Sequence, residues 1–131
     1  MQRRDFHKLS GAALLAALAP GCASVPKEAK QMYGLIGKAT CVPGQRDAFI
    51  AILLEGVSQM PGCLSYVVAR DPKDADSIWI TEVWDSKESH AASLQLPSVR
   101  EAIKRGRPMI ASFGEQTVTE PVGGHGLKQG R

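Results

Sequence analysis

The stretch 77–86, SIWITEVWDS, is the feature that most constrains the fold of this chain. It is rich in β-branched and aromatic residues, which pleated sheets favour, and side chains along a strand alternate between its two faces. Apolar residues fall on both faces, with Ile78, Ile80 and Trp84 on one and Trp79 and Val83 on the other. Such a strand needs cover on both sides. Because a chain of 131 residues has few helices, we expect helices on one face and a second copy of the chain on the other.

Glu82 lies in the middle of this strand among apolar neighbours. A carboxylate in such a place needs a hydrogen-bonding or charged partner. Arg70, on the preceding strand-like segment, is the first candidate for that partner. Glu82 therefore has two possible roles, a structural one with such a partner and a functional one in contact with a ligand.

Residues 1–23 are typical of an export signal. Arg3 and Arg4 are followed by Phe6 and Lys8, which resembles a twin-arginine signal, and an Ala/Leu-rich run fills positions 9–19. That run is far shorter than the ~20 apolar residues that cross a bilayer as a helix. The combination predicts a cleaved signal and a mature protein that works outside the cytoplasm. The alternative, an amphipathic helix of the folded domain, requires a polar stripe that the run lacks.

Two ends of this signal are possible. The segment 18–22, LAPGC, resembles a lipobox, in which Cys22 would be lipidated and the protein anchored to a membrane. Ordinary cleavage after Ala23 would instead release it into the periplasm. We expect a polar tether at 24–31, the folded domain at 32–121, and a flexible glycine-rich tail at 122–131.

The charge and the cysteines exclude several classes of function. Residues 1–22 carry three basic residues and one acidic residue, so setting them aside lowers the net charge from +3 to +1. A domain this close to neutral lacks the basic surface that binds nucleic acid. Cys22, Cys41 and Cys63 show neither CxxC spacing nor a metal-ligand pattern, so no metal site is expected.

The rest of the domain alternates between strand and helix patterns. We expect strands at 32–42, 63–71, 77–86 and 114–120, and helices at 45–60, from 85 or 86 to 94, and from 98 onward. Pro97 is expected to break the second helical segment, and Ser98 and Glu101 to form a capping box that starts the next helix. The order predicts a ferredoxin-like βαββαβ fold of the α+β class with an antiparallel sheet.

This topology makes a prediction about the cysteines. Right-handed crossovers make the first two strands parallel and place the third between them. Cys41 then ends the first strand and Cys63 begins the second, some ~20 Å apart at ~3.3 Å per residue. No disulfide between them is expected within one chain.

From Tyr33 to Gly124 the chain resembles the antibiotic biosynthesis monooxygenase family of dimeric α+β barrels, which includes quinol monooxygenases. The motifs that carry the resemblance are Pro43-Gly44, Pro61-Gly62-Cys63-Leu64-Ser65-Tyr66, Glu82-Val83-Trp84-Asp85-Ser86 and Leu94-Gln95-Leu96-Pro97. The resemblance implies a homodimer, and oxygenation of a small aromatic or quinol substrate by dioxygen without metal, flavin or haem. The haem-degrading branch is set aside, because Ile103 and Gly37 stand where its histidine and asparagine would be.

The resemblance also suggests site residues. Trp84 matches a family position and would form a pocket wall or donate its indole N–H, with core packing as the alternative. Many members carry histidines where this chain has Ser93 and Ser98, so His90 is the candidate base, with a solvated surface position as its alternative. The further substrate-binding candidates are Tyr33, Tyr66 and Glu82.

Two functions from different classes remain open at this point. The first is a cofactor-independent monooxygenase acting on a small aromatic or quinol substrate. The second is a non-catalytic dimeric barrel that binds a small apolar ligand in the cell envelope. A structural interaction module would differ from both because it would have no pocket between the helices and the sheet.

Overall fold

The computed structural model describes residues 31–127. The expected export signal, the lipidation candidate Cys22, tether residues 24–30 and the last four residues of the tail lie outside the described residues. Residues 121–127 contain no helix or strand. Within the described part, none of the helices has the length and apolar character needed to cross a membrane.

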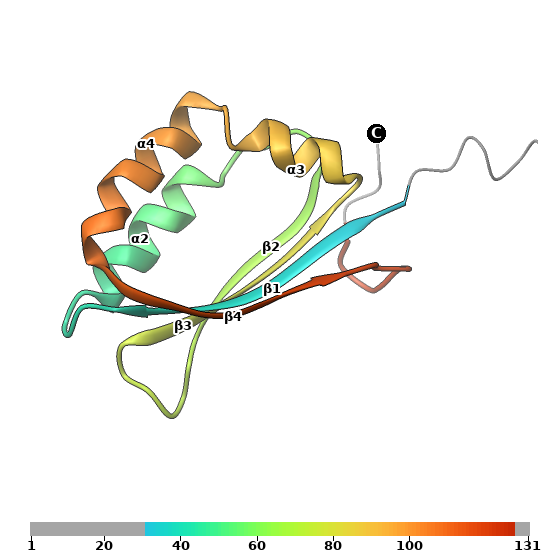
Figure 1. The fold of residues 1–131 in the computed structure, drawn as a ribbon. Helices are drawn as coiled ribbons and strands as arrows, with labels where there is room; N and C mark the ends of the chain where they lie inside the picture. Colours follow the sequence, from blue (N-terminus) through green and yellow to red (C-terminus); the bar gives the residue numbers. More distant parts are fainter. Residues whose placement is uncertain (1–30, 128–131) are drawn as a thin grey trace, which may run out of the picture. The chain divides into compact units, whose positions relative to one another are not determined.

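The chain forms a four-stranded sheet with helices on one side of it (Figure 1). The elements in order are β1 (Tyr33–Cys41), α2 (Arg46–Gly56), β2 (Cys63–Arg70), β3 (Ser77–Trp84), α3 (Lys87–Ser93), α4 (Pro97–Gly106), the 3-10 turn η1 (Arg107–Met109) and β4 (Ile110–Thr119). The strand order is β2-β3-β1-β4, and all neighbours are antiparallel. This is the ferredoxin-like arrangement predicted from the sequence, with β3 between β1 and β2.

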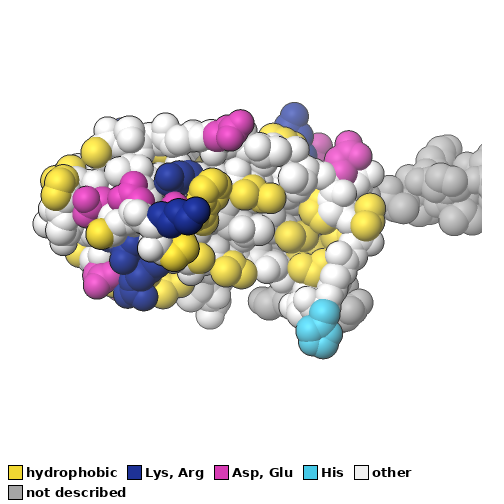
Figure 2. All heavy atoms as spheres, turned by 90° about the horizontal axis from the view of Figure 1, so that it is seen from below, with side chains coloured by type: hydrophobic (Ala, Val, Ile, Leu, Met, Phe, Trp, Pro, Cys, Tyr) yellow, Lys and Arg dark blue, Asp and Glu magenta, His cyan; other side chains and the backbone are white. Residues whose placement is uncertain are grey.

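The two faces of β3 have different surroundings, as its alternating pattern predicts. Ile78 and Trp84 are buried on the side that the helices cover. On the opposite face, which we call the open face, the apolar side chains of Ile36, Val67 and Trp79 remain exposed. Figure 2 shows hydrophobic side chains spread over this face, with charged side chains most frequent toward one end. Within residues 31–127, helices therefore cover one face of the sheet and leave the other open.

The core lies where α2 meets the sheet. Phe49 of α2 packs into a cluster with Ala39, Cys41 and Ile78. The helices α2 and α4 run side by side (Figure 1) and meet at Gly56, where an added Cβ would lie 2.6 Å from the Cβ of Ala102. Gly56 thus allows a close approach between the helices, as expected for a glycine that lowers helix propensity.

Several predicted boundaries were wrong. Helix α2 ends at Gly56 rather than at residue 60, and β4 begins at Ile110 rather than at residue 114. Pro97 does separate two helices, but it is the first residue of α4, a position where its missing N–H costs nothing. The residue before α4 is Leu96 with no side-chain cap, so the capping box predicted at Ser98 does not form.

The register separates the two cysteines of the domain. The backbone N–H of Cys41 donates to the carbonyl oxygen of Asp76, just before β3 begins, while Cys63 pairs with Trp84, where β3 ends. The length of β3 therefore lies between the cysteines, as the topology predicted, and no disulfide joins them.

Candidate functional site

A cavity of about 620 Å³ lies between the helices and the covered face of the sheet. Its walls are mostly apolar and include Leu53 of α2, Ile80 of β3 and Ile103 of α4. Cavities of this size and character are typical of sites for small molecules. A cavity at this place is expected of the two ligand-using functions and argues against a purely structural interaction module.

Four polar or aromatic side chains line this cavity close to one another: Tyr66, Glu82, Trp84 and His90. The indole Nε1–H of Trp84 donates to Oε1 of Glu82 at 2.8 Å. The same Oε1 lies 3.9 Å from Nε2 of His90. Tyr66 is the cross-strand neighbour of Glu82. We refer to Glu82, Trp84 and His90 as the polar cluster.

The sequence explains why these side chains meet. Residues two apart on a strand share a face, so Glu82 and Trp84 both point to the helix side. Ser86 ends the strand segment and caps α3, with its Oγ accepting the N–H of Ser89 at 3.1 Å. Because α3 starts directly after β3, its fourth residue, His90, lies over the end of that strand.

The His90 ring is held by its neighbours. Its centroid lies 5.4 Å from those of Tyr33 and Trp84. Ser93 lies one turn later, and its Oγ donates to the carbonyl oxygen of His90 at 2.6 Å. The His90 side chain is only 21% exposed. His90 is therefore not the solvated surface histidine weighed as its alternative role.

Burial changes the acidity of two groups at the site. It raises the pKa of the Glu82 carboxyl, while the Trp84 N–H and the nearby His90 act in the opposite direction. Burial also raises the pKa of the Tyr66 phenol, and the negative charge of Glu82 adds to this effect. A carboxyl with a raised pKa, beside an imidazole, is suited to accept and return a proton.

The structure brings together four of the five candidate residues at the cavity surface. Tyr33 contacts the His90 ring but is not among the cavity-lining residues. The N–H of Trp84 already binds Glu82, so its suggested role as a donor to substrate is replaced by that of a wall and a support.

The partner predicted for Glu82 was wrong. Arg70 lies opposite Ile78, four residues along β3 from Glu82, and it pairs instead with Asp47 of α2 at 3.0 Å. The carboxylate of Glu82 is satisfied by Trp84, which follows it by two residues. The pattern of alternating faces could have indicated this contact.

Sequence reasoning missed the contribution of the last third of the domain to the cavity. Phe113 and Gln116 of β4 and Arg107 of η1 line it. The only available signal was the helical spacing of residues in α4, which predicts a buried face but not a cavity behind it. No group of three or more potential metal-ligating side chains occurs within residues 31–127.

The chain is thus an α+β protein with a ferredoxin-like sheet and a cavity between that sheet and its helices. The family model for antibiotic biosynthesis monooxygenase matches residues 32–105, so the chain is a member of that family. None of the curated proteins matches it.

Solved structures agree with this assignment. A Chloroflexus aurantiacus J-10-fl protein that carries the family's name is 71% identical over 74% of this chain and 99% of its own, with a TM-score of 0.73. Two more distant structures named for the family show the fold alone. The protein from Nitrosomonas europaea is 15% identical over 70% of this chain and 90% of its own, with a TM-score of 0.65. The protein from Caulobacter crescentus CB15 is 17% identical over 72% and 93%, with a TM-score of 0.66.

Proposed function

We propose that this protein is a monooxygenase that oxygenates a small aromatic or quinol-type substrate with dioxygen and uses no cofactor. The observation that carries the proposal is the polar cluster at one side of a mostly apolar cavity. Membership of the antibiotic biosynthesis monooxygenase family supports the same reaction class. The fold alone would not, since one fold serves many chemistries.

The chemistry needs little from the protein. Removing a proton from a phenolic or quinol hydroxyl gives an anion that is electron-rich enough to reduce dioxygen. The O–O bond then breaks. One oxygen atom becomes bonded to a ring carbon, which loses its hydrogen, and the other leaves as water, while the substrate supplies all four electrons and becomes a quinone. The protein must bind the ring in a dry space and accept the proton.

In this scheme His90 accepts the proton and Glu82 stabilises the imidazolium that results. Their 3.9 Å separation is suited to such a charge interaction. Trp84 fixes the carboxylate through its N–H and closes the wall of the cavity. Tyr66, kept neutral by its raised pKa, can donate a hydrogen bond to a substrate oxygen.

The proposal includes a homodimer in which two copies pack through the open faces of their sheets. On that face Ile36, Val67 and Trp79 are 39%, 52% and 37% exposed. A second sheet would remove these side chains from water.

We also propose that the twin-arginine signal at 1–23 carries the protein out of the cytoplasm, either lipidated at Cys22 or cleaved after Ala23. The support is the sequence pattern described above. Mass spectrometry of the mature N-terminus distinguishes these outcomes, and an intact Met1 in exported protein contradicts both.

The activity is tested by oxygen uptake with a panel of quinols and hydroxynaphthalenes. The variants are His90→Ala and Trp84→Phe, with His125→Ala as a control histidine, since His125 is exposed and does not line the cavity. Loss of a general base should lower kcat by about 100-fold or more. Trp84→Phe keeps the wall but frees Glu82, so it should lower kcat less.

Two results would count against this proposal. If none of the panel consumes oxygen faster than buffer, the non-catalytic ligand-binding barrel becomes the better explanation of the cavity. If His90→Ala and Trp84→Phe match the native rate on an accepted substrate, the enzyme assignment stands but the polar cluster is not its site.

A further inference from the structure

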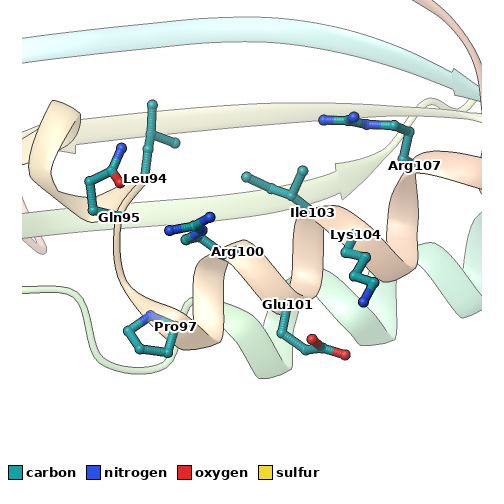
Figure 3. Close-up of a pocket in the computed structure, with 8 residues that line it drawn as sticks. All are labelled: Leu94, Gln95, Pro97, Arg100, Glu101, Ile103, Lys104 and Arg107. Carbon is teal, nitrogen blue, oxygen red and sulfur yellow. The ribbon is translucent and has the colours of Figure 1, made fainter.

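A second hollow opens along α4, next to the cavity that holds the polar cluster (Figure 3). It has a volume of about 710 Å³ and is lined by residues between Leu94 and Arg107. Leu94, Ile103 and Arg107 line both this hollow and the cavity under the helices. The two spaces therefore border the same three side chains, and we call the hollow the mouth of the cavity.

The mouth is basic. Arg100, Lys104 and Arg107 line it, against the single carboxylate of Glu101. In Figure 3, Leu94, Ile103 and Arg107 extend to one side of α4, while Glu101 and Lys104 extend to the opposite side. The acid thus extends to the same side of α4 as Lys104 and to the side opposite Arg107. This leaves Arg100 and Arg107 as the charges beside the apolar surface of Leu94 and Ile103.

Neither arginine is neutralised within residues 31–127. The ion pairs of that part of the chain use Lys38, Arg70, Arg105 and His90 as their basic members. Arg107 lies just beyond the C-terminus of α4, where a cation favours the helix. Arg100, however, is the fourth residue of α4, near the end where the helix dipole disfavours a positive charge. The helix dipole therefore does not account for Arg100 as it does for Arg107.

We infer that the ligand of this protein is an aromatic anion whose ring enters the cavity while its acidic group is held at the mouth by Arg100 and Arg107. This inference rests on the proposed function, whose substrate class it narrows. A guanidinium binds a carboxylate, sulfonate or phosphate in two parallel hydrogen bonds. The mostly apolar walls of the cavity suit the ring better than the acidic group. The two ends together orient the ligand, with its acidic group outward and its hydroxyl toward His90.

The test uses two fluorescent probes that share one ring system. N-phenyl-1-naphthylamine is neutral, and 8-anilinonaphthalene-1-sulfonate has the same ring system with a sulfonate group added. Titration of the native protein should give tighter binding of the sulfonate. In the Arg100→Gln/Arg107→Gln variant, the affinity for the sulfonate probe should fall by about tenfold, and the affinity for the neutral probe should change by less than about twofold.

Arg105→Gln is the matched control. Arg105 is on the same helix, but it pairs with Glu55 at 3.2 Å and does not line the hollow. Its removal should leave the affinity of both probes unchanged. In the native protein, raising the salt concentration from 0.05 to 0.5 M should weaken the binding of the sulfonate probe and leave that of the neutral probe unchanged, because salt screens exposed charges. This second measurement needs no variant and so does not depend on the folding of one.

Equal binding of the two probes by the native protein, or an unchanged preference in the double variant, would overturn the inference. If neither of these results is found, displacement of the bound sulfonate probe by benzoate or by phenyl phosphate shows which acidic group the mouth prefers. Neither probe reacts, so a failure of oxygen uptake would defeat the proposed reaction and leave this result standing. Conversely, uptake with neutral quinols alone would support the reaction and contradict the anionic substrate class.

Discussion

Glu82 shows how one residue links the stability of the domain to the chemistry of its site. Its side chain is 14% exposed, and burial raises the pKa of its carboxyl above the ordinary value of 4.5. The folded state therefore holds this proton more firmly than the unfolded state does. The stability associated with the protonated form is present below pH 4.5 and is lost as the pH rises through the raised pKa.

We therefore expect Glu82→Gln to remove part of the pH dependence of folding. In urea unfolding at pH values from 4 to 8, the native free energy of unfolding should fall, relative to that of the variant, as the pH rises above 4.5. Glu55→Gln is the control, since the Glu55 side chain is 69% exposed and pairs with Arg105 on the surface. Parallel profiles for native protein and Glu82→Gln would contradict the raised pKa.

At the level of single residues, the sequence predicted most of the polar cluster. Trp84 was named from the family resemblance, and Glu82 from its place among apolar residues in a strand. His90 was named because this chain lacks the histidines that many family members carry at positions 93 and 98. Sequence reasoning failed for Arg70, because a partner was sought on the neighbouring strand without knowing the register. It failed for Arg107 and Phe113 because their contact with the cavity depends on the fold as a whole.

The contact between α2 and α4 depends on the absence of a side chain at Gly56. An added Cβ would lie 2.6 Å from that of Ala102, well inside van der Waals contact. Gly56→Ala would gain up to about 1 kcal/mol of helix propensity. Overpacking of this kind costs about 1–3 kcal/mol. The cost of the clash should exceed the gain in helix propensity, because Gly56 is the last residue of α2, where that gain is smallest.

The expected result is a net destabilisation of Gly56→Ala by about 1 kcal/mol, measured by urea unfolding. The double variant Gly56→Ala/Ala102→Gly moves the methyl group to the other helix. It should therefore be more stable than the sum of the two single changes predicts. Strict additivity of the two changes would show that the helices do not meet at this point.

At the level of elements, the types and order were predictable, but the ends were not. Strand β2 starts at the predicted residue because the Pro61-Gly62 turn precedes it, and β3 does so because the polar loop 72–76 precedes it. Helix α4 begins one residue before the predicted start because Pro97 serves as its first residue rather than as a break. Ser98 and Glu101 match the capping-box pattern, but Pro97 can take the first helical position at no cost, so the helix begins there instead.

The open face of the sheet leads to a prediction for the whole molecule. If two copies pair through it, a charge placed at Val67 should separate them. We expect the native protein to elute as a dimer at micromolar concentration in size-exclusion chromatography with light scattering, and Val67→Asp as a monomer. Leu54→Asp is a matched control, since Leu54 on α2 is 53% exposed and Val67 is 52% exposed. A native monomer at that concentration would rule out the barrel.

If two copies pair through the open face, the sheet separates the dimer interface from the ligand cavity within each subunit. Trp79 and Ile36 project from one side, while Glu82 and Trp84 project from the other, so subunits joined through the first side leave both cavities unobstructed. In such a dimer, ligand could enter the cavity of one subunit without any rearrangement of the other subunit. Saturation by ligand should then follow a simple hyperbola with a Hill coefficient of about one, as for two sites without coupling free energy. A mixed dimer with one inactive subunit should retain half of the turnover.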